Sequence, residues 1–550
     1  MKLVALLLRS SLRTVSLAVL AGIVAGVSNT GLLIIINSVL SNSDTPRDRL
    51  IWGFALLCLL MLVSRAASWI FLVQLAHGVT FKLRRELSAR ILAAPLQQLE
   101  KLGAPRLLAT LTDDVSAIAG ALAATPMLVV HIVVVVTCLG YLGWLSLPAL
   151  LGVFAFLLVG VLCYQLPLRR ALSYLGASRH ELDALLKNFR SLIEGNKELK
   201  LHRARREAFF HDQLEEAALS FRRKASAGDA IYALTASFGH LLIFILIGLL
   251  IFVLPVLQPT ETATTIGYSL VILYLMPPLE VIMNALPALG RANVALQKIE
   301  AMGLSLAAKS VERSTTISSP SHDYQSLKLE GVTHSYDSED GDGFQLGPVD
   351  LSFRPAELVF LVGGNGSGKT TLAKILTGLY APDQGAVYLD GEKITDETRD
   401  QYRQLFAAVF SDFHLFESLL GLNAGALDQQ ALQYLRRLQL DRKVQVIEGV
   451  LSTTDLSHGQ RKRLALLTAY LEDRPFYVFD EWAADQDPLF KEIFYLRLLP
   501  ELKARGKTVI VISHDDRYFH VADRILKLNY GKMEQEILTS LKSSVVISTS

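Results

Sequence analysis

Cysteine is scarce in this sequence, which has three cysteines among 550 residues. Cys58, Cys138 and Cys163 each lie in an apolar run, and no two of them have the spacing of a metal site or a redox pair. The sequence therefore excludes a site built from paired thiols. We expect all three cysteines to be small, buried apolar side chains.

Charged residues are also few, at 19% of the chain, whereas soluble domains carry about 25%. The net charge is only +2, so the sequence lacks the basic excess of nucleic-acid-binding proteins, and we expect no nucleic-acid partner. Hydrophobic residues make up 51% of the chain and are unevenly spread. A chain of this length is too long for one ordinary domain, so the uneven distribution indicates domains of different kinds.

Long hydrophobic runs are present in the first part of the chain. A helix needs about 20 mostly apolar residues to span a bilayer, and six segments reach that length. The N-terminus resembles a signal peptide, but its apolar run continues past Leu40 without a clear cleavage site, so we interpret it as a retained first membrane helix. The predicted spans are roughly residues 12–40, 50–75, 123–146, 148–166, 229–255 and 264–287.

The connections between these spans differ in charge. Residues 167–227 contain thirteen lysines and arginines, whereas the loops on the other side of the membrane contain only Arg47 and Arg49. Positive charge is retained in the cytoplasm, so both termini and both long connections are predicted to be cytoplasmic. The long connections have helical periodicity, and we expect each to form two helical extensions of about 20–30 residues. The short "SLP" between the third and fourth spans predicts a tight hairpin.

The composition changes after Leu304. A polar stretch follows, and then short β-branched strands alternate with helices, which is typical of an α/β domain. We therefore predict a membrane domain over residues 1–304, a linker over 305–324, an α/β domain over 325–537 and a polar tail over 538–550.

The string "GGNGSGKTT" follows the strand "LVFLV" and opens a helix, which is the context of a phosphate-binding loop. Glycines let the backbone N–H groups surround phosphates, and the helix N-terminus adds partial positive charge. Lys369 is predicted to reach the β- and γ-phosphates, and the Thr370 hydroxyl to bind Mg²⁺. The expected cofactors are ATP and Mg²⁺. The predicted loop residues are Gly363, Gly364, Asn365, Gly366, Ser367, Gly368, Lys369, Thr370 and Thr371.

The string "YVFDEWAADQDP" ends an apolar strand with four carboxylates in eight residues. Such neighbours repel one another unless a cation or a hydrogen-bond donor faces them. Asp480 lies at the strand end, where a carboxylate assists Mg²⁺, and Glu481 is placed to polarise the attacking water. The metal would then offset the negative charge. Asp485 receives no role from the sequence.

The string "LSHGQRKRLALL" resembles the signature of ATP-binding-cassette (ABC) ATPases, with His458 in place of the usual second glycine. The resemblance implies that Ser457, Gly459 and Gln460 contact the nucleotide of the opposite subunit. It also implies roles for three residues in the strings "HSYD", "DQDP" and "VISHDD". These residues are Tyr336 for adenine stacking, Asp487 for the loop that crosses the dimer, and His514 for the γ-phosphate.

One position departs from the family pattern. The string "AVFSDFHLF" has Ser411, followed by Asp412, where the family usually has a glutamine that helps to hold Mg²⁺. The shorter serine would reach the metal only through water, and we keep both residues as candidate metal ligands.

The resemblance covers the whole chain. "EGNKELKLHR", "VFSDFHLF", "SHGQRKRLAL" and "DEWAADQDP" together are similar to exporters of cyclic peptides and peptide siderophore precursors, the pyoverdine and syringomycin type. This implies a six-helix membrane α-helical domain of the type IV (type I) ABC exporters, followed by an α/β P-loop ABC ATPase domain. It further implies a homodimer in the lipid bilayer of the bacterial inner membrane, with cytoplasmic ATPase domains, that exports a peptide-like small molecule.

Three alternatives remain at this point. The first is a lipid or multidrug flippase, although a cavity for cationic drugs would need acids, and these spans carry few. The second is an ATP-binding membrane regulator without turnover, against which Lys369, Glu481 and His514 argue. The third, a solute-gated channel, has no support in the sequence.

Overall fold

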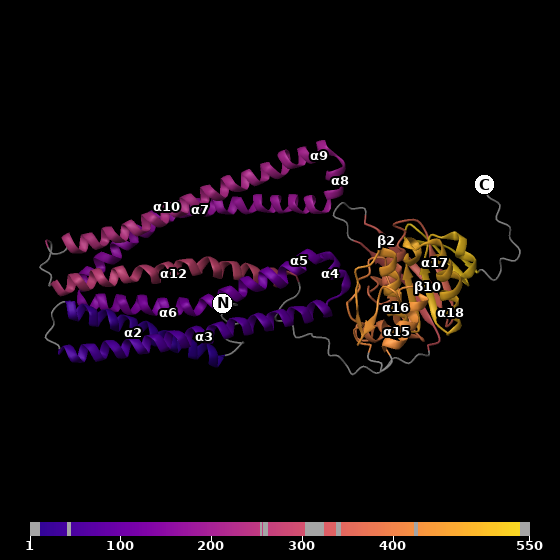
Figure 1. The fold of residues 1–550 in the computed structure, drawn as a ribbon, viewed down its shortest axis with the longest axis horizontal. Coiled ribbons are helices and arrows are strands. Elements are labelled where there is room, and N and C mark those ends of the chain that lie inside the picture. Colours follow the sequence, from indigo (N-terminus) through magenta and orange to yellow (C-terminus); the bar gives the residue numbers. More distant parts are fainter. Residues whose placement is uncertain are drawn as a thin grey trace. The chain divides into compact units, whose positions relative to one another are not determined.

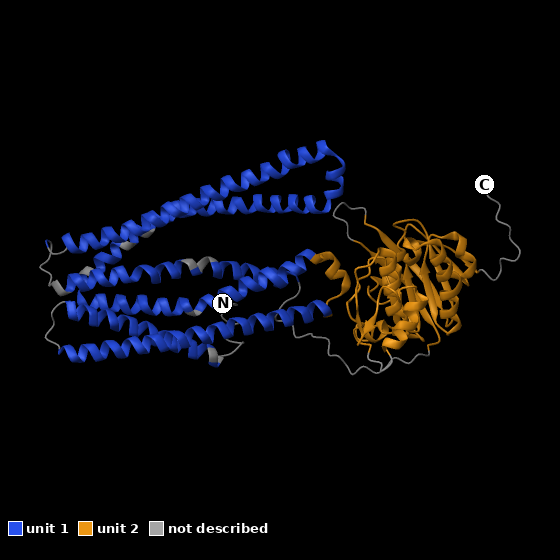
Figure 2. Cartoon of the chain, in the orientation of Figure 1, with its two compact units in different colours: residues 1–92, 105–309 blue, residues 93–104, 310–550 orange. Residues whose placement is uncertain are grey.

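The structure, a computed structural model, describes residues 12–40, 46–253, 256, 262–302, 324–336, 343–422 and 427–538. The chain forms two compact units (Figure 2). Unit 1 is Met1–Leu92 with Pro105–Lys309, and unit 2 is Ala93–Ala104 with Ser310–Ser550. The predicted linker up to residue 323 and the predicted tail from residue 539 lie outside the described residues, so those domain boundaries stay predictions.

Unit 1 is helical (Figure 1). Six stretches are long and apolar enough to cross a membrane, which confirms the six predicted spans: Val15–Leu40, Arg47–Ala93, Ala104–Leu145, Leu150–Glu194, Arg203–Val253 and Thr264–Ala301. The helices are α2 (Leu12–Leu40), α3 (Arg47–Ala93), α5 (Ala104–Ala109), α6 (Val115–Leu145), α7 (Leu147–Glu194), α8 (Asn196–Leu201), α9 (Arg203–Ala208), α10 (Glu216–Gly248) and α12 (Thr262–Ala301). Three π-helical segments continue them at Thr110–Asp114, Phe209–Glu215 and Leu249–Val253.

The predicted helical extensions are present. Helix α3 continues beyond its apolar part to Ala93, and α7 continues to Glu194. The hairpin is also confirmed, because α6 ends at Leu145 and α7 begins at Leu147. The Tyr268 hydroxyl of α12 donates to the Leu142 carbonyl at 2.7 Å, which attaches α12 to this turn.

The cysteines correct one expectation. Cys138 is buried in the core formed by α6, α7, α10 and α12, whereas Cys58 is half-buried and Cys163 is exposed. The expectation that all three are buried is therefore wrong for Cys163. An apolar run in a membrane domain can face lipid as well as a protein core.

Unit 2 contains two main sheets. The larger has the strand order β12-β11-β3-β10-β9-β6, and the smaller has the order β2-β1-β4-β5. The strands are β1 (Leu327–Ser335), β2 (Gln345–Phe353), β3 (Leu358–Val362), β4 (Gln384–Leu389), β5 (Glu392–Lys393), β6 (Phe406–Val409), β7 (Val446–Ile447), β8 (Val450–Leu451), β9 (Phe476–Asp480), β10 (Thr508–Ile512), β11 (Arg524–Asn529) and β12 (Lys532–Leu538). The helices are α4 (Leu96–Leu102), α13 (Lys369–Leu376), α14 (Arg399–Arg403), α15 (Leu427–Arg437), α16 (His458–Glu472), α17 (Pro488–Ile493) and α18 (Leu499–Ala504).

The larger sheet is buried on both faces, because alternate residues of a strand point to opposite sides. In β3, Phe360 packs into the core that contains α16, whereas Val359 and Leu361 pack into the core that contains α13. Strands β6, β9, β10, β3 and β11 run parallel to one another. Their carboxyl ends therefore share one edge, where ligands bind in open α/β sheets.

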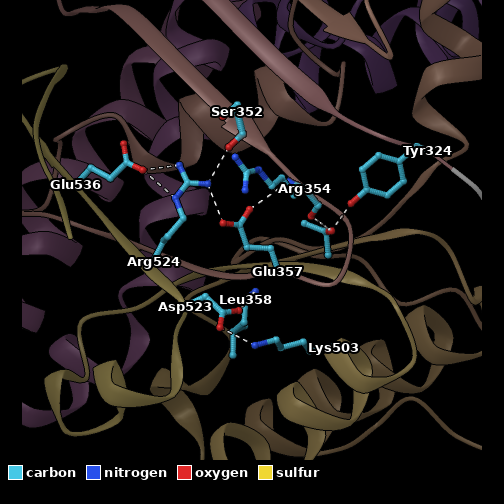
Figure 3. Close-up of polar contacts among 10 residues, drawn as sticks. Tyr324, Ser352, Arg354, Glu357, Leu358, Lys503, Asp523, Arg524 and Glu536 are labelled. Atoms are coloured by element: carbon cyan, nitrogen blue, oxygen red, sulfur yellow. Dashed lines mark hydrogen bonds and ion pairs between the residues drawn. The ribbon is translucent and has the colours of Figure 1, made fainter. Parts of the chain in front are cut away.

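The opposite edge of this sheet is held by polar contacts (Figure 3). The Arg524 guanidinium is 11% exposed and bonds to Glu357 at 2.9 Å, to Glu536 and to the Ser352 carbonyl. Asp523 accepts from the Leu358 N–H at 2.9 Å. These contacts join the start of β3 to the start of β11, so the amino ends of the strands are fixed in register.

Helix α4 belongs to unit 2 although it precedes the rest of that unit by about two hundred residues. Leu96 packs against the core that contains α13. Glu100 accepts from Lys374 at 2.8 Å and also bonds to the Tyr380 hydroxyl. Burial and the Glu100 carboxylate together raise the pKa of Tyr380, so this hydroxyl stays protonated as a donor.

The buried Arg524 leads to a prediction about stability. Arg524→Met leaves Glu357, which is also largely buried, without its cation, so we expect the free energy of unfolding of unit 2 to fall by about 3 kcal/mol. Lys527→Met is the matched control on the same strand, because its pair with Glu534 is exposed and should contribute less than about 1 kcal/mol. Denaturant titration of the purified full-length chain measures both. Equal effects of the two variants would contradict this account.

Candidate functional site

The phosphate-binding loop lies between β3 and α13, at the carboxyl edge of the larger sheet. All five residues of β3 are buried, which fixes where the loop begins. The loop needs glycine at several positions, since φ is 152° at Gly363, 74° at Gly366 and 97° at Gly368. A Cβ atom at Gly363 would lie 2.2 Å from the Leu528 carbonyl oxygen. The loop therefore has the compact shape that lets its backbone approach a ligand.

Lys369 is 6% exposed and lies inside the curve of this loop. Its ammonium donates to the carbonyl oxygens of Gly363 at 2.9 Å and Gly364 at 2.8 Å. Burial lowers the pKa of Lys369, while the charges of Glu481 and Asp480 oppose that shift. The carboxylates thus keep a cation available at the loop.

Thr370 and Asp480 come together at the start of α13. The Thr370 hydroxyl donates to the Asp480 carboxylate at 2.9 Å, and Asp480 is only 1% exposed. Burial raises the pKa of Asp480, with the Glu481 charge adding to this effect, and the bond from Thr370 opposes it. A hydroxyl beside a desolvated carboxylate offers the oxygen ligands that Mg²⁺ prefers.

Two further observations fit a magnesium nucleotide at this place. The Ser367 hydroxyl is buried and has no hydrogen-bond partner within the part of the chain that the structure describes. The described residues also contain no group of three or more His, Cys, Asp or Glu side chains arranged to hold a metal ion by themselves. Mg²⁺ is commonly held by one or two protein oxygens together with phosphates and water rather than by a closed cage of side chains.

Glu481 and His514 follow neighbouring strands. Asp480 of β9 pairs with Ile512 of β10, so the residues after these two strands must lie close together. His514 Nε2 lies 3.2 Å from Glu481 Oε1. Glu481 has a φ of 49°, and its carbonyl accepts from Lys462 at 2.9 Å. Its N–H donates to the Ile512 carbonyl at 3.1 Å, so both sides of its backbone are held, and its carboxylate points toward His514.

A cavity of about 610 Å³ extends from the phosphate-binding loop to Glu481, a size that suits a nucleotide. Its lining residues come from the regions after β1, β3, β6 and β9: Tyr336, Phe344, Asn365, Gly366, Ser367, Gly368, Lys369, Thr370, Thr371, Ser411 and Glu481. Asp412 is exposed next to Ser411, and its charge contributes to the raised pKa of Asp480.

Aromatic side chains form one wall of this cavity. The Tyr336 hydroxyl lies 3.2 Å from Thr371 Oγ1, and its ring lies 6.3 Å from that of Phe344. Phe344 was not predicted from the sequence. A Cβ atom at Gly368 would lie 2.9 Å from the Phe344 ring, so this ring packs directly on the loop. Its place at the start of β2, opposite Tyr336, depends on strand pairing that no local pattern reveals.

Ser457, Gly459, Gln460 and Asp487 do not line this cavity, among the described residues. Ser457 precedes α16, and its N–H donates to the Gln460 side chain at 3.4 Å. A Cβ atom at Gly459 would lie 2.8 Å from the Asp485 carbonyl oxygen. Glycine is therefore required where the start of α16 meets the loop after β9.

Asp485, for which the sequence suggested no role, connects these two segments. Its carboxylate lies 2.6 Å from Lys462 Nζ and 3.3 Å from His458 Nε2. The hydrogen bond from Lys462 lowers the pKa of Asp485 more than its burial raises it. The basic string "RKR" after the signature was the only sequence signal for such a partner.

Asp487 makes a second connection of this kind. Its carboxylate accepts from the Phe490 N–H at 2.9 Å, which caps α17, and it contacts Arg463. The Phe490 N–H and then Arg463 lower the pKa of Asp487. The start of α16 is thus attached to the loop after β9 by two ion pairs.

Comparisons with known proteins agree with this geometry. Residues 346–484 match the family described as ABC transporter, and residues 14–276 match the ABC transporter transmembrane region. The chain is 36% identical to the ATP-binding protein SyrD of Pseudomonas syringae pv. syringae, over 94% of this chain and 93% of SyrD. It is 26% identical to an ATP-dependent lipid A-core flippase of Dechloromonas aromatica, over 90% of this chain and 86% of the flippase.

A solved structure resembles the whole chain. It is a bacterial Atm1-family ABC exporter with ATP bound, with a TM-score of 0.72 and 17% sequence identity. The similarity covers 97% of this chain and 96% of that one. At this identity the likeness shows the fold alone.

Lys462 leads to a prediction about turnover. Lys462→Met removes the ammonium that joins the Asp485 carboxylate to the Glu481 carbonyl, so the Glu481 carboxylate should lose its position. We expect ATP hydrolysis to fall about tenfold or more, because a charge-assisted hydrogen bond contributes about 1.5–3 kcal/mol. ATP affinity should change little, since Lys462 is not among the described residues that line the cavity. Phosphate release and nucleotide titration measure the two quantities.

Two further variants make this test specific. Lys462→Arg keeps a cation and should recover part of the turnover, whereas Lys443→Met, at an exposed lysine of the same unit, should change neither quantity. If Lys462→Met weakened ATP binding as much as hydrolysis, the positioning role would be wrong.

Proposed function

The chain belongs to the ABC transporter family, and from this we propose that it is one half of a homodimeric exporter that moves a peptide-derived small molecule across the bacterial inner membrane. As a family member it is an ATP-hydrolysing, multi-pass membrane transporter with a cytoplasmic ATPase domain. The observation that carries the ATPase part of the proposal is the meeting of Lys369, Thr370, Asp480, Glu481 and His514 at one edge of a single sheet.

We assign the roles within one chain from these contacts. Lys369 and the loop N–H groups would bind the β- and γ-phosphates of ATP. Thr370 and Asp480 would hold Mg²⁺, which supplies charge neutralisation for phosphoryl transfer. Glu481 would orient the attacking water, and His514, at 3.2 Å from it, would contact the γ-phosphate. Tyr336 would stack on adenine, with Phe344 behind it.

The remaining site residues imply a second copy of the chain. Ser457, Gly459, Gln460 and Asp487 lie at the start of α16 and α17, outside the cavity that holds Lys369. A symmetric dimer would place them against the nucleotide bound by the partner subunit, so each composite site would use both chains. Ser411 and Asp412 would contact Mg²⁺ only through water.

The cargo class rests on similarity rather than on geometry. The strings around Glu198, Ser411, Ser457 and Glu481 resemble exporters of cyclic peptides and siderophore precursors, and the identity to SyrD is higher than that to the flippase of Dechloromonas aromatica. A lipid flippase is the second candidate, because those relatives match over most of the chain. Uptake of a cyclic lipopeptide or of lipid A into inverted vesicles distinguishes the two: ATP-dependent uptake of lipid A alone would refute peptide export.

The role of Glu481 predicts a separation of binding from hydrolysis. Glu481→Gln should bind ATP and accumulate a closed dimer, because the amide keeps the size of the side chain, while hydrolysis falls by about 100-fold or more, as for loss of a catalytic base. Single-turnover phosphate release and nucleotide-retention assays measure this. Glu534→Gln, at an exposed site of β12, is the control. Near-normal hydrolysis by Glu481→Gln would refute the assigned role.

The composite site predicts rescue in mixed dimers. Ser457→Arg and Lys369→Ala should each inactivate a homodimer, but a heterodimer of the two has one site with both lesions and one site with neither. We expect partial ATP hydrolysis to return in purified heterodimers. If each site lay within one chain, every site would keep one lesion and no activity would return.

Rescue could also be absent if both sites of a dimer must be intact for hydrolysis. A cross-link distinguishes this explanation from a site that lies within one chain. After replacement of Cys58, Cys138 and Cys163, cysteines are introduced next to Ser457 and next to Gly364. A disulfide between chains supports the composite site. A disulfide that forms only within one chain would refute it.

A further inference from the structure

A second cavity lies within the membrane-spanning part of unit 1. Its volume is about 300 Å³, and its walls come from α2, α3, α6 and α12. Most lining residues are apolar, and each of the four helices adds at least one polar side chain. The lining is Ala25, Asn29, Arg65, Ser68, Trp69, Leu72, Val73, Ala123, Met127, Val130, His131, Val134, Tyr274, Pro277 and Pro278.

Arg65 is the unusual member of this lining, since a permanent cation inside an apolar span is costly and commonly functional. It lies in the string "LLMLVSRAASWIFL" of α3. Ten residues separate it from the end of the predicted span at residue 75, which corresponds to about 15 Å along a helix. Its side chain is too short to cover that distance, so the guanidinium does not reach the cytoplasmic interface along α3.

Arg65 has no carboxylate partner among the described residues of this chain. No hydrogen bond or ion pair of Arg65 occurs within the ranges that the structure describes, and no acidic residue lines the cavity. Glu280 of α12, two residues beyond Pro278, contacts His240 of α10 at 2.5 Å instead. The acid nearest in sequence to this cavity wall therefore already has another partner.

His131 of α6 faces the same cavity. Its Nδ1 atom is buried and, as far as the described residues extend, has no hydrogen-bond partner. Asn29 of α2 adds an amide. A guanidinium, an imidazole and an amide on three different helices all offer N–H donors to one small space, and such a group of donors suits an anionic oxygen group.

We propose that this cavity is a subsite for the anionic end of the cargo. Arg65 binds a carboxylate, His131 and Asn29 complete its hydrogen bonds, and Trp69 and Tyr274 cover the adjoining apolar part of the molecule. The volume suits one acidic side chain or head group rather than a whole cyclic peptide. The cargo class is therefore an amphipathic peptide-derived molecule with at least one carboxylate. This inference rests on the proposed function and deepens it.

Binding by the full-length protein in nanodiscs of phosphatidylcholine tests this subsite without ATP. The probes are a short N-dodecanoyl peptide that contains aspartate and the same peptide with asparagine. We expect the wild-type protein to bind the aspartate peptide about tenfold more tightly, because hydrogen bonds to charged groups are the stronger ones. Arg65→Gln should remove this preference, and Arg65→Lys, which keeps the charge without the planar fork, should retain part of it.

Arg84→Gln is the matched control, since Arg84 is exposed on the same helix beyond the predicted span, and it should bind both peptides as the wild type does. Elution volume and thermal midpoint verify that each variant is folded. Equal affinity of the wild-type protein for the two peptides, or a preference that survives in Arg65→Gln, would overturn the proposal.

A competition experiment with lipid distinguishes a peptide carboxylate from a lipid phosphate as the anion that binds. Phosphatidic acid in the nanodisc should compete with the aspartate peptide no more strongly than phosphatidylcholine does. If phosphatidic acid binds in an Arg65-dependent manner and the peptide does not, the subsite takes a lipid phosphate and the peptide assignment is overturned. Because these measurements use no ATP, a wild-type protein that failed to hydrolyse ATP would refute the proposed function without affecting this result.

Discussion

Four carboxylates within eight residues after β9 are the constraint on which the ATPase unit depends. Side chains of like charge at this density destabilise a fold unless each has a separate partner. The structure provides one for each, and the partners come from three separate segments. For Asp480, Glu481, Asp485 and Asp487 the partners are Thr370, His514, Lys462 and Arg463. Satisfying the charges therefore also fixes α13, α16 and the end of β10 around one loop.

The parallel sheet makes this arrangement possible. Strands β3, β9 and β10 end at one edge, so the phosphate loop, the acids and His514 meet without any long-range adjustment. The Arg524 network at the other edge holds the strand starts in place (Figure 3). At the edge with the phosphate loop, the Ser367 hydroxyl is buried without a hydrogen-bond partner among the described residues, so it still offers a donor to a ligand.

Much of the fold and of the candidate site could be predicted from the sequence, wherever a feature is determined by residues that are neighbours in the chain. Hydrophobic length located six spans, and the glycine pattern located the phosphate loop, because both are set by neighbouring residues. Phe344, Asp485 and Arg65 were not recognised, since their significance depends on what faces them across a strand pair, a helix start or a cavity. The expectation for Cys163 was wrong for a related reason: an apolar run does not show whether a residue faces protein or lipid.

Helix α4 has a consequence for the order of events during synthesis. Glu100 and Lys374 are separated by 274 positions in the chain. At about 20 residues per second, translation supplies the lysine about 14 s after the glutamate. During that interval Leu96 and Glu100 have no partner in unit 2, because the core against which α4 packs has not yet been made. A chain that stops before α13 can never form this contact. The docking of α4 therefore has to wait until translation has supplied α13 and the strands of the core that Leu96 joins.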